Sequence, residues 1–219
     1  MMLNRCGVGL IGLLLTLAVM LGDNQASELP LVFTEDFERG HDRWELTDDS
    51  AWTWKEVDGN HVFGLNRRKS DYQPVVRSPH NLALVKDLEL SEFVVTFRVR
   101  STKDTGNHRD CCVFFCYQDP THFYYCHFGA KSDPHSGQVM VVNGTPRQAI
   151  TRNTQPIRWT DNWHRVKVSR HADGLVEVFF DDMTKPMMSV TNTRFGKGRI
   201  GIGSFDDMND FDDIRIYGR

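Results

Sequence analysis

The stretch Phe93-Val-Val-Thr-Phe-Arg-Val-Arg100 decides the fold class of this chain. The residues at positions 93, 95, 97 and 99 are apolar, whereas Thr96, Arg98 and Arg100 between them are polar. An apolar period of two predicts a β-strand with one buried face. Further strands are expected from similar runs at residues 111–118, 122–128, 138–142, 163–170, 175–181, 198–204 and 211–217.

Turn-forming dipeptides separate these predicted strands. They are Asp119-Pro120, Asp133-Pro134, Asn143-Gly144, Asp173-Gly174 and Lys197-Gly198. Asp-Gly between two alternating runs indicates a β-hairpin, and no window of the chain has the period of a long amphipathic helix. Many short antiparallel strands predict an all-β sandwich or barrel in one domain, without the parallel sheet that holds a nucleotide.

The overall composition is that of an ordinary globular protein. Of 219 residues, 40% are hydrophobic and 25% are charged, which excludes a disordered or collagen-like chain. The formal net charge is -3, so the chain lacks the basic surplus that is typical of a protein whose main ligand is nucleic acid. We therefore expect no nucleic-acid partner.

The first 26 residues have the pattern of a secretory signal peptide. Arg5 precedes the uncharged apolar run 7–21, and small residues follow around Ala26. The run is shorter than the roughly 20 residues that span a bilayer, although an uncleaved N-terminal anchor is the alternative. We expect a signal peptide at 1–26, a mature domain at 27–219 without a membrane span, and a location in the periplasm or outside the cell.

Both ends of the mature region resemble a known superfamily. Phe33-Thr-Glu-Asp-Phe-Glu-Arg-Gly40 looks like the opening, and Trp163-His-Arg-Val-Lys-Val168 and Phe211-Asp-Asp-Ile-Arg-Ile216 look like the final strands, of concanavalin A-like jelly-roll domains. This superfamily includes laminin-G-like lectin modules and family 16 glucanases. The resemblance implies an antiparallel jelly-roll β-sandwich over about residues 31–218 and a function in handling carbohydrate.

The middle of the chain is similar to a narrower group, exported bacterial proteins described as 3-keto-disaccharide hydrolase-like or family 16 hydrolase-like. The segments that carry this similarity are Arg77-Ser-Pro-His80, Gly106-Asn-His-Arg-Asp110, Asp119-Pro-Thr-His-Phe-Tyr-Tyr125 and Val142-Asn-Gly-Thr-Pro-Arg147. The Glu-x-Asp-x-Glu strand that holds the catalytic carboxylates of family 16 glucanases is absent. We therefore expect glycan binding by a lectin-like sandwich, with a glycoside hydrolase-like enzyme and a structural or adhesion module as the alternatives.

Histidines and acids cluster in this middle segment. His108 and Asp110 could act as a base and a carboxylate in proton transfer, so they are the candidate catalytic residues. Polar and aromatic side chains around them could hydrogen-bond to sugar hydroxyls or stack on sugar rings. These candidate sugar-binding residues are Arg109, Tyr124, His127, Asp133, His135, Asn143 and Arg147. The alternative is a loop whose charges pair locally.

Acidic residues near the two ends of the domain are candidate ligands for a structural calcium ion. They are Asp36, Glu38, Asp212 and Asp213. First and last strands of jelly-rolls commonly pair, so the resemblance suggests that the early acids meet the late ones around an oxygen-bound cation. A hydrated acidic turn is the alternative, and no cofactor is expected to be required. A zinc site is disfavoured because the two histidines of strand 122–128 point to opposite faces.

The cysteines of the mature region lie close together in the sequence. They are Cys111, Cys112, Cys116 and Cys126. An exported protein can oxidise its cysteines, and Cys116 and Cys126 lie on either side of a predicted hairpin. These two are therefore the most plausible disulfide pair, and the alternative is that all four are small reduced core residues.

Overall fold

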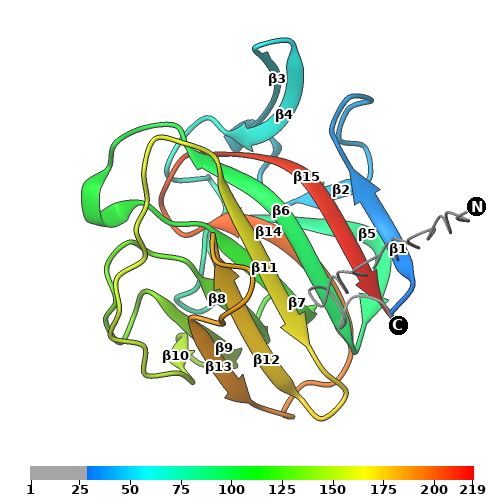
Figure 1. Ribbon diagram of the computed structural model, residues 1–219, viewed down its shortest axis with the longest axis vertical. Helices are drawn as coiled ribbons and strands as arrows, with labels where there is room; N and C mark the ends of the chain where they lie inside the picture. Colours follow the sequence, from blue (N-terminus) through cyan, green and yellow to red (C-terminus); the bar gives the residue numbers. More distant parts are fainter. Residues whose placement is uncertain (1–28) are drawn as a thin grey trace, which may run out of the picture.

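The computed structural model describes residues 29–219, which form two antiparallel β-sheets stacked on each other (Figure 1). The predicted signal peptide, residues 1–26, lies outside the described residues. Helical structure in residues 29–219 is limited to the short 3-10 turns η1 (Asp49–Ala51) and η2 (Gly106–His108). No helix in this range is long and apolar enough to cross a membrane.

The larger sheet has eight strands and the smaller sheet has seven. The larger sheet follows the spatial order β13 (Met188–Thr191), β12 (Leu175–Phe180), β11 (His164–Arg170), β6 (Phe93–Ser101), β15 (Asn209–Gly218), β4 (Asn60–Leu65) and β3 (Trp52–Val57). Its eighth strand, β1 (Leu31–Glu35), pairs with β15, so the first and last strands are neighbours as expected. The smaller sheet follows the order β10 (Gln148–Ala149), β9 (Gln138–Asn143), β8 (His122–His127), β7 (Cys112–Asp119), β14 (Gly198–Ser204), β5 (Asn81–Leu90) and β2 (Trp44–Leu46).

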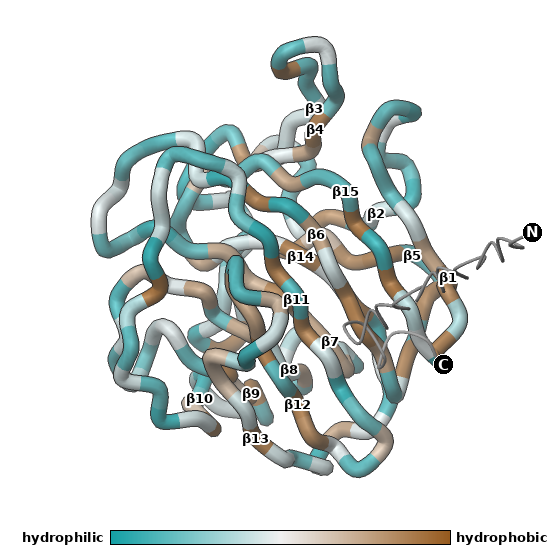
Figure 2. Tube along the Cα trace, in the orientation of Figure 1, coloured by the Kyte–Doolittle hydropathy of each residue, from teal (hydrophilic) through white to brown (hydrophobic). Residues whose placement is uncertain are grey.

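The main core lies between the two sheets, and β6 contributes to its centre. Strand β6 is paired on both sides, with β11 and β15, and the side chains of Phe93, Val95 and Phe97 are at most 3% exposed. Each such side chain stabilises the folded state by about 1.5–3 kcal/mol when it is buried. Figure 2 shows the resulting contrast between hydrophobic central strands and hydrophilic connecting loops. The apolar period of two in residues 93–100 therefore corresponds to a β-strand with a buried face, as the sequence predicted.

The outer face of the smaller sheet is buried as well. It carries a second apolar cluster, formed by Leu82, Leu84, Cys112, Phe114, Phe123, Tyr125, Met140 and Val142. Val76, from the segment that joins β4 to β5, packs against this second cluster. Hydrogen bonds hold that segment, because Ser70 Oγ donates to His80 O and Arg147 N donates to Arg77 O. The segment that joins β4 to β5 thus covers the outer face of the smaller sheet. A polar space remains at one end of this sheet.

All eight strands expected from the sequence are present, each with ends within two residues of the prediction. The Asp173-Gly174 turn joins β11 to β12, with Gly174 at a φ of +84°. The earlier strands were implied only by the resemblance. Strand β5 shows why: residues 81–85 are all buried, since alternate side chains enter the two apolar clusters and no polar alternation marks the strand. The predicted antiparallel β-sandwich is confirmed.

The predicted Cys116–Cys126 disulfide is wrong, since the four cysteines of the described residues are free and buried. In the pairing of β7 with β8, Cys126 lies opposite Val113, whereas Cys116 belongs to an irregular stretch and has a φ of +47°. The Cys116 thiol instead donates a hydrogen bond to Gly196 O at 3.4 Å. Burial raises the pKa of Cys116 to about 11, so this thiol is protonated at neutral pH. The cysteines are small core residues.

Candidate functional site

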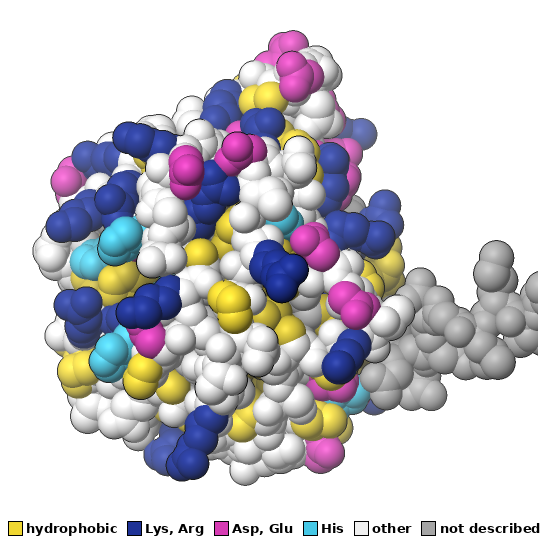
Figure 3. All heavy atoms as spheres, turned by 60° about the vertical axis from the view of Figure 1, so that its left-hand side comes forward, with side chains coloured by type: hydrophobic (Ala, Val, Ile, Leu, Met, Phe, Trp, Pro, Cys, Tyr) yellow, Lys and Arg dark blue, Asp and Glu magenta, His cyan; other side chains and the backbone are white. Residues whose placement is uncertain are grey.

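A pocket of about 390 Å³ lies at one end of the smaller sheet. It forms where β7 begins and β8 and β14 end, because these antiparallel strands are neighbours in the sheet. We call it the polar pocket, and its lining residues are Arg77, Asn107, His108, Asp110, His127, Lys131, Asp133, His135, Ser136, Arg147, Phe205 and Asp206. On the side of the molecule that Figure 3 brings forward, His side chains lie among Lys and Arg side chains.

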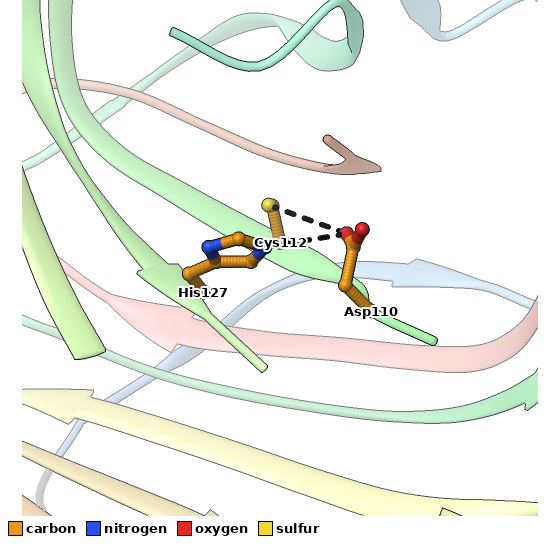
Figure 4. A group of neighbouring side chains, drawn as sticks. All are labelled: Asp110, Cys112 and His127. Atoms are coloured by element: carbon orange, nitrogen blue, oxygen red, sulfur yellow. Dashed lines mark hydrogen bonds and ion pairs between the residues drawn. The ribbon is translucent and has the colours of Figure 1, made fainter. Parts of the chain in front are cut away.

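Asp110 is the buried acid of the polar pocket. Its carboxylate accepts hydrogen bonds from Ser204 Oγ at 2.8 Å and from the backbone N–H groups of Phe205 and Asp206 at 2.8 and 3.2 Å. His127 Nε2 lies 3.7 Å from Asp110 Oδ1 (Figure 4). Burial raises the pKa of Asp110, but the nearby His127 and these hydrogen bonds outweigh it, so that the pKa is lowered overall. Asp110 is therefore an ionised anchor for the chain after β14.

Contacts at both ring nitrogens hold His127 in one orientation. Its Nδ1 lies 3.1 Å from the backbone oxygen of His135, which only accepts hydrogen bonds, so Nδ1 carries a proton. Its Nε2 consequently faces the carboxylate of Asp110. The imidazole also stacks on Phe205, with ring centroids 5.8 Å apart. His127 thereby joins the buried acid to the aromatic part of the polar pocket.

Phe205 is the aromatic centre of the polar pocket. The guanidinium carbon of Arg147 lies 4.2 Å from the centroid of its ring, and that of Arg77 lies 5.8 Å away. The ring of His80 meets the same phenyl group edge-on, at 5.5 Å. A cation over an aromatic ring is attracted by the negative face of the ring. Phe205 therefore gathers side chains from three separate segments of the chain.

Charged groups at the rim of the polar pocket pair with one another. Lys131 Nζ lies 3.3 Å from Asp133 Oδ2, and Arg68 Nη2 lies 3.1 Å from Asp206 Oδ2. His108 has a side chain that is 63% exposed, and its Nδ1 lies 3.5 Å from the same oxygen of Asp206. In residues 29–219, no hydrogen bond or ion pair joins the side chains of His108 and Asp110. The two candidate catalytic residues thus line one pocket without pairing.

Most of the candidate catalytic and sugar-binding residues come together in the polar pocket. They are His108, Asp110, His127, Asp133, His135 and Arg147. Arg109, Tyr124 and Asn143 lie elsewhere. Arg109 is buried, forms an ion pair with Asp161, and lines a neighbouring cavity of about 530 Å³. Asn143 is exposed at the end of β9 that lies away from His127.

Tyr124 lies in the main core between the sheets and is 1% exposed. Its hydroxyl donates to Asn192 Oδ1 and accepts a hydrogen bond from the backbone N–H of Phe195. Side chains alternate along β8, so Tyr124 points away from the face that carries Tyr125 and His127. Tyr124 and His127 therefore belong to opposite faces of the smaller sheet.

Two important lining residues were not among the predicted site residues. Phe205 directly follows β14, and Arg77 lies in the covering segment between β4 and β5. The Arg77-Ser-Pro-His80 motif was one of the segments that carried the family resemblance. That resemblance was the signal by which Arg77 could have been predicted as a site residue. No local pattern marked Phe205, because its position depends on the pairing of β14 with β7.

Among the described residues, Asp110, Cys112 and His127 form a group that offers three metal-ligand atoms within 4.8 Å of one another. These side chains already satisfy one another: Cys112 Sγ lies 4.0 Å from Asp110 Oδ1 as a weak donor. Burial raises the pKa of the Cys112 thiol well above its ordinary value, which opposes the thiolate that a metal needs. The group is complete as a buried hydrogen-bonded cluster.

The candidate calcium ligands have other partners in the structure. Asp212 and Asp213 both form ion pairs with Arg98, at 2.7 and 2.6 Å, and Glu38 lies 3.0 Å from His61 Nδ1. Asp36 accepts a hydrogen bond from the backbone N–H of Glu38. Although β1 and β15 pair as expected, no three of these four carboxylates gather into a cation-sized group in the described range.

No protein-family model matches this chain, and no curated protein matches it. Solved structures do match it. The carbohydrate binding module CBM66 from Bacillus subtilis superposes with a TM-score of 0.58 at 15% sequence identity, over 80% of this chain and 96% of that one.

Two further matches have the same architecture. Domain 4 of AbnA, a GH43 extracellular arabinanase from Geobacillus stearothermophilus in complex with arabinotriose, has a TM-score of 0.55 at 13% identity, over 87% of this chain and 93% of that one. Lectin I-B4 from Griffonia simplicifolia has a TM-score of 0.51 at 11% identity, over 84% and 98%. At these identities the similarity is one of fold. The fold of this chain is the lectin-like jelly-roll β-sandwich of these solved structures, which is the fold that the sequence resemblance implied.

Proposed function

We propose that this protein is an exported carbohydrate-binding module whose ligand enters the polar pocket. The observation that carries the proposal is the convergence of six predicted site residues, from several loops and strand ends between residues 108 and 147, on one pocket with an aromatic centre. The matched structures add support, since they are a carbohydrate binding module, a lectin and a domain in complex with arabinotriose.

The pocket has the two kinds of group that bind sugars. Phe205 offers an apolar surface, and partly exposed polar side chains such as His135 and Ser136 stand beside it. Sugars present apolar ring faces and a fixed array of hydroxyls, so an aromatic ring supplies contact area while directional donors and acceptors supply specificity. No metal is needed for this kind of recognition.

Binding is favoured over catalysis by the state of the two candidate catalytic residues. Asp110 is a buried, ionised acceptor that already receives three hydrogen bonds, so it is poorly suited to exchange protons with a substrate. His108 stands exposed at the rim beside Asp206. A general acid and base pair requires a group that reaches the substrate and is free to change its protonation state. The glycoside hydrolase-like alternative therefore has weaker support.

The proposal is tested with a glycan array that is read for both binding and cleavage. We expect saturable binding to a limited set of glycans and no released product. The variant Phe205→Ala should lose binding, whereas Asn143→Ala, an exposed residue outside the pocket, should bind like the original protein. Cleavage of a bound glycan would favour the enzyme, and a blank array would favour a structural or adhesion module.

A further inference from the structure

The charge balance of the polar pocket leaves two arginines without acidic partners. Asp133 is paired with Lys131, and Asp206 is paired with Arg68. The third acid, Asp110, faces His127 and accepts several hydrogen bonds. In contrast, neither Arg77 nor Arg147 forms an ion pair with any residue in the range 29–219. These two guanidinium groups are therefore the cations of the pocket lining that lack an acidic partner.

The donors of Arg147 are also unused within the described protein. Its Nε and Nη1 atoms are buried and have no hydrogen-bond partner. A buried donor without a partner is unfavourable, because it has lost its hydrogen bonds to water and has formed none within the protein. A ligand with negatively charged oxygens would correct this imbalance, whereas a neutral hydroxyl would correct less of it, since charge-assisted hydrogen bonds are the stronger ones.

Both guanidinium groups are oriented before any ligand binds. They lie near the ring of Phe205, at 4.2 and 5.8 Å, and the backbone N–H of Arg147 donates to the backbone oxygen of Arg77 at 3.0 Å. Stacking of this kind fixes a guanidinium without using its N–H groups. Those N–H groups form a planar fork that matches the oxygens of a carboxylate or a sulfate.

We propose that the polar pocket binds the anionic group of an acidic saccharide, a uronate carboxylate or a sulfate ester, between Arg77 and Arg147. This inference rests on the proposed carbohydrate-binding function and specifies its ligand class. The anionic oxygens take the free donors of the two arginines, and the remainder of the sugar lies against the rim that carries His108 and His135. The exposed rim histidines then contact hydroxyls of the same ligand.

The test compares matched saccharides by titration calorimetry with the full protein. The probes are a uronate oligosaccharide and its carboxyl-reduced neutral form, together with a sulfated oligosaccharide and its desulfated form. We expect at least one anionic member to bind about tenfold or more tightly than its neutral counterpart, and that affinity to fall as salt is added. Preference for the uronate or for the sulfated probe identifies which anionic group is the natural one.

Variants link this preference to the two arginines. Arg77→Ala and Arg147→Ala should each reduce the affinity for the anionic probe by about tenfold, and Arg147→Lys should restore only part of it, because lysine lacks the planar fork. Arg194→Ala, at an exposed arginine between β13 and β14, is the matched control and should change nothing. Thermal unfolding of each variant verifies that the fold is retained.

Equal binding of neutral and anionic probes, or an array whose hits are all neutral, would overturn the anionic assignment and leave carbohydrate binding intact. Absence of binding to every probe and every array glycan would instead overturn the proposed function itself. Retention of the anionic preference in a folded Arg147→Ala variant would also contradict the proposed contacts.

Discussion

Asp110 and Asp207 are neighbouring buried carboxylates whose pKa values shift in opposite directions. The backbone N–H of Asp110 donates to Asp207 Oδ2 at 3.3 Å. Burial raises the pKa of Asp207 to about 6, and the charge of Asp110 adds to this rise, against hydrogen bonds from Ser101 and Thr105. The pKa of Asp110 is lowered in spite of its burial, because His127 faces it. One site thus holds an acid that ionises readily beside an acid that keeps its proton up to about pH 6.

Asp207 makes the stability of the protein depend on pH. Its folded pKa of about 6 exceeds its ordinary value of 3.8, so below pH 4 the carboxyl is protonated in both states and costs nothing. Between pH 4 and 6 the unfolded state gives up the proton first, and stability falls as pH rises, by on the order of 2–3 kcal/mol in total. In Asp207→Asn this fall should be absent. Urea unfolding of both proteins between pH 4 and 7 measures it, and parallel profiles would contradict the prediction.

Asp110 should be important for stability as well as for the shape of the pocket. Asp110→Asn removes the charge that faces His127 and leaves an amide N–H group among donors from Ser204 and Phe205. We expect a loss of about 2–4 kcal/mol in the free energy of unfolding. The control Asp133→Asn alters a partly exposed rim pair and should cost less than about 1 kcal/mol. Urea unfolding at pH 7 compares them, and equal losses would refute the structural role of Asp110.

Strand β14 illustrates how an element depends on the absence of side chains. It lies between β5 and β7 in the smaller sheet, and it ends next to the polar pocket. A Cβ atom on Gly203 would lie 1.9 Å from the backbone oxygen of Asn81 and 3.0 Å from the ring of Phe114. The Gly-x-Gly pattern at 201–203 is therefore a packing requirement of the sheet.

Gly203→Ala should be strongly destabilising. Because β14 is paired along both edges, the added methyl group forces apart backbone that has no room to move, at a cost of about 3 kcal/mol or more. Gly196→Ala lies seven residues earlier, where nothing stands within 4 Å of the new Cβ atom, and should change stability by less than about 0.5 kcal/mol. Thermal unfolding of both variants is the measurement. A Gly203→Ala variant as stable as Gly196→Ala would show that the sheet accommodates the methyl group.

At the scale of the whole molecule, the fold is held by two apolar layers. One lies between the sheets, and the other lies between the smaller sheet and the segment that joins β4 to β5. Neither layer depends on a disulfide among the described residues, and ion pairs occupy most of the acids once expected to bind calcium. Hydrophobic burial is thus sufficient to account for a stable sandwich of this size.

Removal of divalent metal should therefore leave the stability of this protein unchanged. Asp212 and Asp213 both form ion pairs with Arg98, so these two carboxylates already have a cationic partner. We expect the same Tm in the presence of EDTA as in the presence of added calcium, measured by differential scanning calorimetry. A chelator-induced fall in Tm that calcium reverses would revive the calcium hypothesis for the acids at the two ends of the chain.

Much of the fold was accessible from the sequence because its signals are local. Alternation in Phe93–Arg100 and the Asp173-Gly174 turn depend on residues a few positions apart, and both correspond to observed elements. Strand β5 was not recognised individually, because its first half, residues 81–85, is buried on both faces. The disulfide prediction failed for a related reason: cross-strand register, which places Cys126 opposite Val113, is not readable from spacing.

The sequence by itself determined the class of the fold, the strands of its second half and a segment rich in site residues. The period of two along strand 122–128 already implied that Tyr124 and His127 point to opposite faces, although both were predicted for one site. Only the tertiary structure decided which of those residues meet. Phe205, Arg77 and Arg147 are far apart in the chain, and their contact follows from sheet pairing and from a loop folded over the smaller sheet. Such contacts depend on long-range packing, for which a short stretch of sequence contains no pattern.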